Sequence, residues 1–133
     1  MPDGDVAAWF HEYLSAFAAC GRGERSPSSV LSYYDTPLLM STDAALESLT
    51  GPDEVLAMVE QQVEAMRAAG YDHSEVLDAQ TKIVNAGTAV HYSRFSRRRA
   101  DGSELSKLAV TYLISRHPTG RRISALLIHS QVE

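Results

Sequence analysis

Residues 88–116 decide the fold, and they read TAVHYSRFSRRR (88–99), ADGS (100–103) and ELSKLAVTYLISR (104–116). Apolar residues in this part of the chain follow a period of two, which is typical of β-strands because successive side chains point to opposite faces. Asp101-Gly102 is a strong signal for a tight hairpin turn. The stretch therefore predicts two long antiparallel strands, 88–99 and 104–116.

The same period of two predicts one more strand on each side of this hairpin, at about 73–84 and 121–130. Asn85-Ala-Gly87 separates the first of them from the hairpin, and His117-Pro-Thr-Gly120 separates the last. Connections this short force antiparallel neighbours, since a parallel crossover needs a dozen or more residues. We therefore expect a curved antiparallel sheet in the C-terminal part of the chain.

Three helical segments precede this sheet. The first ends near Gly21, and its apolar residues recur every three or four positions, as the buried stripe of an amphipathic helix does. The stripe comprises Val6, Trp9, Phe10, Tyr13, Phe17 and Cys20. Ser26-Pro27 opens a short second helix that runs to about Tyr34, because proline fits the first position of a helix.

The third helix has the clearest start and stop signals. Thr50-Gly-Pro-Asp53 resembles a capping box, with an acid three residues after the cap, and Gly70 ends the helix. Its buried stripe comprises Val55, Val59, Val63 and Met66. Two short strands, Leu38-Leu39-Met40 and about 45–49, lie between the second and third helices. No long linker or repeat interrupts the chain, so residues 1–133 predict a single α+β domain with helices first and strands later.

Charge and composition limit the class of protein. The net charge of −5 is divided unevenly, with −11 in residues 1–80 and +6 in residues 81–133. A nucleic-acid-binding protein would more often be basic overall, so we expect no nucleic-acid partner. No apolar run approaches the ~20 residues that span a bilayer. The acidic N-terminus is unlike a signal peptide, and Cys20 is the single cysteine. We expect a soluble, cytoplasmic protein without a membrane partner.

The last predicted strand is apolar on both faces. Strict alternation places Ile123, Ala125, Leu127 and His129 on one face, and Leu126 and Ile128 on the other. An antiparallel sheet with one solvated face would alternate apolar with polar residues, so both faces need a cover. The helices can cover one face, and we expect a second subunit on the outer face, which gives a homodimer. A covering loop or the chain's own terminus is the alternative.

The order of these elements, together with three short segments, carries a resemblance to a known family. The segments are Tyr13-Leu-Ser-Ala-Phe17, Tyr33-Tyr34-Asp35 and Arg122-Ile-Ser-Ala-Leu-Leu-Ile-His129-Ser130. In order and spacing the chain resembles the nuclear transport factor 2-like superfamily, which includes SnoaL-like polyketide cyclases and ketosteroid isomerases. The resemblance implies a cone, in which three N-terminal helices pack on a strongly curved mixed or antiparallel sheet and leave a mostly apolar cavity.

Such a cavity implies a small hydrophobic molecule as the ligand. The residues that we expect to line it are aromatic or apolar: Trp9, Tyr13, Tyr34, Met40, Met58, Tyr112 and Leu127. His129 is the expected polar anchor, because it shares a predicted strand face with Leu127. A histidine in such a place can accept a proton near neutral pH.

The resemblance also implies how an isomerase of this superfamily would work. In those enzymes an acid at the end of the first strand moves a proton, while a tyrosine and a second acid stabilise the enolate. Tyr13 falls at the tyrosine position, but Met40 or Ser41 falls at the first acid position and Thr111 at the second. We therefore do not expect this mechanism here.

SnoaL-like cyclases instead use carboxylates and histidines from the later strands. The candidates of that kind are Asp35, Asp78, His91 and His129, with Tyr92 and Tyr112 as hydrogen-bond donors. Structural alternatives remain open: satisfied histidines in the core, an Asp35 that caps a turn, and a Tyr13 that only packs. His91 and Tyr92 lie on opposite faces of one strand, so at most one of them can face the cavity.

Arg97-Arg98-Arg99, with Arg94 and Lys107 nearby, gathers positive charge around the predicted hairpin turn. Phosphate or coenzyme A could dock on such a cluster. A solvated hairpin tip that protects the strands from edge pairing is the simpler explanation. The remaining histidines have no partners at metal-ligand spacing, so we expect neither a metal nor a cofactor.

Three functions follow as alternatives. The first is a cytoplasmic dimer that binds a small hydrophobic molecule in the cone. The second is an isomerase, cyclase or hydratase that uses His129 or His91 with Asp78 or Asp35. The third is a non-catalytic assembly module with a vestigial cavity. Fold alone does not choose among them. A carboxylate or histidine that pairs with another polar group inside the cavity would favour the enzyme.

Overall fold

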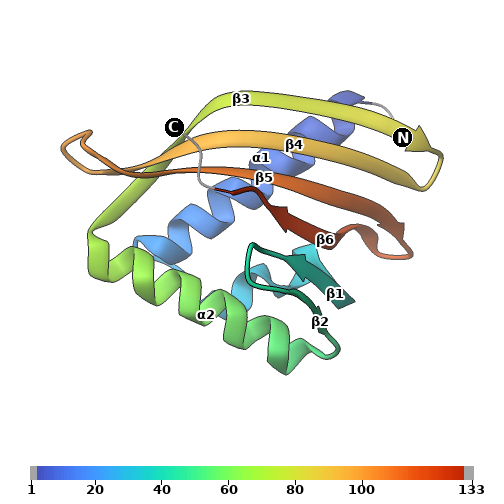
Figure 1. The fold of residues 1–133 in the computed structure, drawn as a ribbon, viewed down its shortest axis with the longest axis horizontal. Coiled ribbons are helices and arrows are strands. Elements are labelled where there is room, and N and C mark those ends of the chain that lie inside the picture. Colours follow the sequence, from blue (N-terminus) through green and yellow to red (C-terminus); the bar gives the residue numbers. More distant parts are fainter. Residues whose placement is uncertain (1–2, 131–133) are drawn as a thin grey trace.

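The computed structural model describes residues 3–130 and contains the predicted elements in the predicted order (Figure 1). They are α1 (Asp3–Gly21), the 3-10 helix η1 (Pro27–Tyr33), β1 (Tyr34–Ser41), β2 (Leu46–Leu49), α2 (Pro52–Ala69), β3 (Tyr71–Asn85), β4 (Thr88–Arg99), β5 (Glu104–His117) and β6 (Gly120–Ile128). The short second helix is a 3-10 helix, and β1 is longer than predicted.

The strands form one mixed sheet in the order β2-β1-β6-β5-β4-β3. The neighbours among the four C-terminal strands are antiparallel, as their short connections predicted. β1 pairs with β2 in the antiparallel sense, but β1 and β6 run parallel. These two strands are far apart in the chain, so no short turn limits their relative direction. The sheet is therefore mixed rather than purely antiparallel.

The core lies between the helices and the inner face of the sheet. The long strands β3, β4 and β5 curve over α1, and α2 lies below them in Figure 1. α2 buries its whole predicted stripe, each residue being at most 4% exposed: Val55, Val59, Val63 and Met66. α1 buries most of its own stripe, although Trp9 and Phe17 are only half-buried. No helix within residues 3–130 is long and apolar enough to cross a membrane.

The start of α2 differs from the predicted capping box by one residue. Gly51 is the residue at the N-cap, Pro52 follows in the first turn, and the acid in the third position is Glu54 rather than Asp53. The Glu54 carboxylate accepts hydrogen bonds from the Thr50 N–H at 2.6 Å and the Thr50 hydroxyl at 3.2 Å. The acid thus still satisfies a free backbone donor at the helix start. The predicted stop is confirmed, since Gly70 has the left-handed φ of 84° that favours glycine.

A register shift in β6 changes which of its residues face inward. Ile123 lies opposite the core residue Ile114, whereas Ala125 lies opposite Leu113, so Ser124 is an extra residue between the two pairs. A bulge of this kind reverses the alternation of faces. Ile123 therefore belongs to the inner core with Leu126. The expectation that Ile123 shares a face with Leu127 and His129 is wrong.

A core substitution tests this assignment of the inner face. Ile114 is fully buried, so Ile114→Ala removes packed methylenes and is expected to lower the free energy of unfolding by about 2–5 kcal/mol. Leu77 is 41% exposed on the edge strand β3, and Leu77→Ala is expected to change it by about 0.5 kcal/mol or less. Urea unfolding of both variants measures the difference. Equal losses would contradict the assignment of Ile114 to the core.

Candidate functional site

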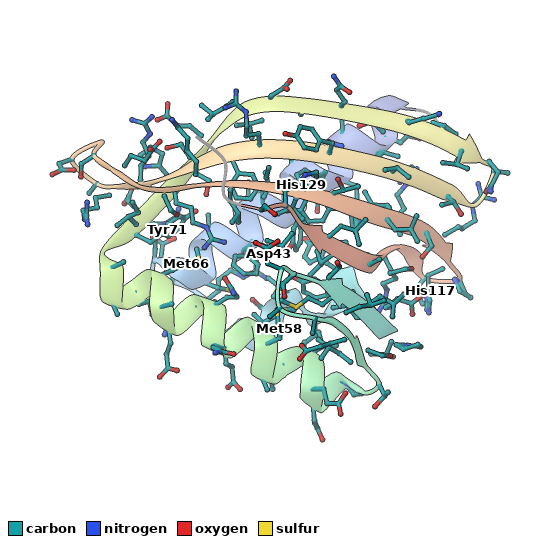
Figure 2. All side chains as sticks on the ribbon, in the orientation of Figure 1. Asp43, Met58, Met66, Tyr71, His117 and His129 are labelled. Atoms are coloured by element: carbon teal, nitrogen blue, oxygen red, sulfur yellow. The ribbon has the colours of Figure 1, made fainter. Side chains whose placement is uncertain are left out.

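A cavity of about 170 Å³ lies between α1, α2 and the inner face of the sheet. Figure 2 places two of its lining residues, Met58 and Met66, on α2, and a third, Tyr71, where α2 leads into β3. Most of the wall is apolar: Leu14, Phe17, Ala18, Met40, Met58, Met66, Phe95, Leu108, Val110, Leu126 and Ile128. The polar part of the wall comprises Tyr13, Tyr34, Thr42, Gln62, Tyr71, Ser74, Arg97 and Tyr112.

Three tyrosines from different elements meet at this wall. Tyr13 of α1 and Tyr34 of β1 share a hydrogen bond of 2.7 Å between their hydroxyls. The ring of Tyr112 from β5 packs against Tyr13 at 6.1 Å. Burial raises the pKa of all three hydroxyls above the usual value. They therefore stay protonated at neutral pH and are hydrogen-bond donors rather than bases.

Arg97 of β4 brings the positive charge of the cavity wall. Its Nε is buried and has no hydrogen-bond partner. Burial lowers the pKa of Arg97. Arginine nevertheless keeps its charge in proteins. The cavity is thus apolar except for neutral donors and one cation.

The expected ligand-binding residues fall into two groups. Five of them line the cavity: Tyr13, Tyr34, Met40, Met58 and Tyr112. Trp9 does not line it; its ring lies behind the wall, 6.3 Å from Tyr13 and 5.6 Å from Tyr33. Leu127 is 41% exposed and faces away from the cavity because of the bulge in β6. The expectations for Trp9 and Leu127 are therefore corrected.

His129 also lies outside the cavity, which corrects its expected place as the polar anchor. It is exposed, and its Nε2 pairs with the Thr111 hydroxyl at 2.7 Å. The rings of Tyr92 and His129 pack in a T-shaped arrangement, with their centroids 5.3 Å apart. Asp43 borders the same shallow hollow on the outer side. The cause is again the bulge, which turns the alternate residues after Ser124 outward.

The comparison with protein families assigns this chain to a family. The family described as NTF2-like protein (DUF6841) matches residues 3–131, almost the whole sequence. The chain belongs to this NTF2-like family. The match confirms the resemblance to the nuclear transport factor 2-like superfamily. In a comparison with curated proteins, none matches the chain.

Solved structures of the same fold come from several bacteria. A domain of unknown function with a cystatin-like fold from Nostoc punctiforme is 19% identical, with a TM-score of 0.71 over 100% of this chain and 81% of that chain. An NTF2-like protein of unknown function from Shewanella oneidensis is 16% identical, with a TM-score of 0.70 over 98% and 100%. Aln2 from a Streptomyces species is 15% identical, with a TM-score of 0.67 over 97% and 93%. These likenesses show the fold alone.

In this NTF2-like protein His91 faces inward but does not reach the cavity. It is 4% exposed, and its Nδ1 pairs with the Thr81 hydroxyl at 2.7 Å. Its ring lies 4.1 Å from Phe10 and 6.2 Å from Tyr112, and its Nε2 is buried without a partner. Burial lowers the pKa of His91. Tyr92 lies on the opposite face, as predicted from strand alternation.

The two candidate aspartates lie away from the cavity of this NTF2-like protein. The Asp35 carboxylate accepts the Thr36 N–H at 2.9 Å. Asp78 is exposed on β3, opposite Arg94. Among the described residues 3–130, no aspartate, glutamate or histidine lines the cavity. The same residues contain no group of three or more histidines, cysteines or acids that could hold a metal ion.

Met40 and Thr111, which fall at the positions of the isomerase acids, lie on different faces of the sheet. Met40 lines the cavity, but Thr111 lies on the outer face and pairs with His129. The cavity instead receives the residue that follows, Tyr112. The polar groups that an acid–base mechanism of that kind requires are therefore not assembled at this wall.

The arginine cluster of the β4–β5 hairpin divides between two faces. Arg98 pairs with Glu75 at 2.6 Å and donates to the Gly102 carbonyl at 2.9 Å. Arg99 donates to the Ala69 carbonyl at 3.2 Å. Only Arg97 of the three lines the cavity. The sequence interpretation missed its role, although alternation with the buried Phe95 two residues earlier places it inside.

The lowered pKa of His91 makes a prediction about pH and stability. Because the unfolded chain titrates near pH 6.5 and the folded chain below it, the unfolded state binds more protons between the two pKa values. The contribution of His91 to the free energy of unfolding is complete above about pH 6.5. It is lost as the pH falls from there through the pKa of the folded state. Urea unfolding at several pH values between 7.5 and 5.5 should therefore give a smaller loss of stability for His91→Gln than for the wild type.

A matched control for this experiment is His117→Gln, at the distant turn between β5 and β6 (Figure 2). The control is expected to follow the wild-type pH dependence. A His91→Gln variant that loses as much stability as the wild type would contradict the assignment of this titration to His91.

Proposed function

We propose that this NTF2-like protein binds a small, mostly apolar molecule in the cavity between its helices and sheet. The observation that carries the proposal is the cavity itself, about 170 Å³ with a largely apolar and aromatic wall. Binding sites for small molecules are concave and apolar, with a few polar groups that fix orientation. An engineered cavity of about 150 Å³ in another protein holds a benzene molecule. The expected ligand is therefore about as large as one aromatic ring.

The chemistry of the wall favours binding over the alternative of an acid–base enzyme. A general base has to lie within hydrogen-bond reach of the proton that it removes. The candidate histidines His91 and His129 lie elsewhere, and the tyrosines at the wall stay protonated. The alternative of a vestigial cavity is also less favoured, because buried side chains have not filled the space.

A cavity-filling substitution tests this proposal. Leu108 lines the cavity and is only half-buried, so Leu108→Trp adds volume where the wall has room. With the wild type, toluene and benzyl alcohol are expected to raise the melting temperature, and the increase is expected to grow with the ligand concentration. Leu108→Trp is expected to abolish this increase. Leu105→Trp, three residues earlier on the same strand and outside the cavity, is the control that retains it.

No stabilisation of the wild type by either compound, over concentrations up to their solubility, would contradict binding in the cavity. Equal stabilisation of the wild type and Leu108→Trp would place the binding elsewhere on the protein.

We also propose that two copies of the chain pair through the outer face of the sheet. Three leucines are exposed on neighbouring strands: Leu39 by 43%, Leu46 by 69% and Leu127 by 41%. The register brings them together, since Ser41 lies beside both Leu46 and Leu127, and Leu39 lies beside Ala125. A second copy is the expected cover, because an isologous contact places the same apolar patch on both partners.

Light scattering tests the dimer. The wild type is expected to have the mass of a dimer at tens of micromolar, and Leu127→Glu is expected to have the mass of a monomer because it places a charge in the patch. Leu77→Glu introduces the same charge at a similarly exposed leucine on β3 and is expected to remain dimeric. A monomeric wild type would refute the proposal.

A further inference from the structure

Arg97 differs from the other described arginines because it lines the cavity, where its buried Nε has no hydrogen-bond partner and its charge has no carboxylate partner. Arg22 pairs with Glu24 at 3.0 Å, Arg98 pairs with Glu75 at 2.6 Å, and Arg121 lies 3.6 Å from Asp5. No ion pair formed within residues 3–130 includes Arg97. Its cross-strand neighbours are Ser74 and Ser106, neither of which carries charge.

An unpaired cation at an apolar wall costs free energy, and the cost is recovered when an anion arrives. Burying a charge without a partner is unfavourable, whereas a paired and hydrogen-bonded charge is tolerated. The Nε–H of Arg97 is buried and donates to nothing within the described residues. The guanidinium of arginine presents its donors as a planar fork that matches a carboxylate. The free donor and the charge thus both favour a small anion in the cavity.

The tyrosines at the cavity wall supply further hydrogen-bond donors for an anion. Only one hydrogen is needed for the bond between the Tyr13 and Tyr34 hydroxyls, so the second hydrogen of the pair remains free to donate. Tyr112 lines the same cavity and brings another hydroxyl. The Tyr71 hydroxyl is already bonded to Ser74 at 2.9 Å. The cavity therefore combines one fork-shaped cation with neutral O–H donors, and it has no carboxylate among its described lining residues to repel an anion.

We propose that the ligand of this cavity is a small apolar carboxylate, about the size of one aromatic ring, whose carboxylate pairs with Arg97. This inference rests on the proposed binding function and names the chemical class of its ligand. The apolar body of the ligand lies against the methionines and leucines of the wall, and the carboxylate accepts hydrogen bonds from Arg97 and the tyrosine hydroxyls. A strongly hydrated anion such as phosphate fits the charge but not the apolar wall.

A charge series of ligands with one ring tests the proposal on the full chain. Benzoate, benzyl alcohol, benzylamine and inorganic phosphate are titrated by calorimetry at pH 7.5 and constant ionic strength. Benzoate is expected to bind about tenfold or more tightly than benzyl alcohol, because hydrogen bonds to a charged group are the stronger ones. Benzylamine is expected to bind more weakly than benzyl alcohol. Phosphate is expected to bind more weakly than benzoate.

The series separates the two proposals. If benzyl alcohol binds as tightly as benzoate, the carboxylate inference is overturned and the binding function stands. If phosphate binds as tightly as benzoate, the site is a general anion site and the inference is overturned. If none of the ring compounds binds, the binding function and the inference are both overturned.

Variants of Arg97 provide the second test. Arg97→Met is expected to reduce the affinity for benzoate about tenfold or more and to leave the affinity for benzyl alcohol nearly unchanged. Arg97→Lys keeps the charge without the planar fork and is expected to retain part of the preference for benzoate. Arg94→Met, on the outer face of the same strand, is the matched control that should bind as the wild type does.

The melting temperature without ligand gives an independent measurement. Arg97→Met is expected to melt at a higher temperature than the wild type, because an apolar side chain replaces a half-buried charge that has no ion-pair partner. If this variant does not fold, Tyr112→Phe tests the same site, since it removes one donor and is expected to weaken benzoate severalfold while sparing benzyl alcohol. Wild-type affinity for benzoate in Arg97→Met, or in Tyr112→Phe as its substitute, would overturn the proposal.

Discussion

The parallel pairing of β1 with β6 is the constraint on which the rest of this structure depends, because it joins the N-terminal half of the chain to the C-terminal sheet. Its register places Tyr34 beside Ile123 and Met40 beside Leu126. Tyr34 and Met40 thereby reach the cavity wall that the helices and the other strands complete. Closing so long a loop costs conformational entropy that only the packed core repays. The cavity exists because this strand pair closes the sheet around the helices.

Local sequence signals predicted most of the fold, but they did not predict the pairing of β1 with β6, which are far apart in the chain. Gly70, Asp101-Gly102 and the α2 stripe that begins at Val55 each act within a few residues, so the sequence displays them directly. The bulge at Ser124 has no comparable local signal in the sequence. Since side chains alternate with a period of two, one extra residue exchanges the two faces of everything that follows. For that reason His129 was predicted at the wall and lies outside it.

The candidate site was predicted in part, and the errors have physical causes. Tyr13 was found because helix periodicity marks the buried side of a helix. Trp9 belongs to the same stripe, but the stripe is wider than the cavity and Trp9 packs on Tyr33 instead. Arg97 was missed because two further arginines follow it, and three adjacent charges are typical of a solvated hairpin. Because side chains alternate along a strand, Arg97 and Arg98 point to opposite faces of the sheet.

The contrast between these two neighbours indicates what the cavity is suited to hold. Arg98 pairs with Glu75 on the outer face, where a surface ion pair contributes little to stability. Arg97 stands on the inner face, where a partner would matter far more, and the chain provides none among the described residues. Sequences depart from local consistency mainly at functional sites. A wall with a cation and neutral donors, but no carboxylate, is suited to hold negative charge and poorly suited to move protons.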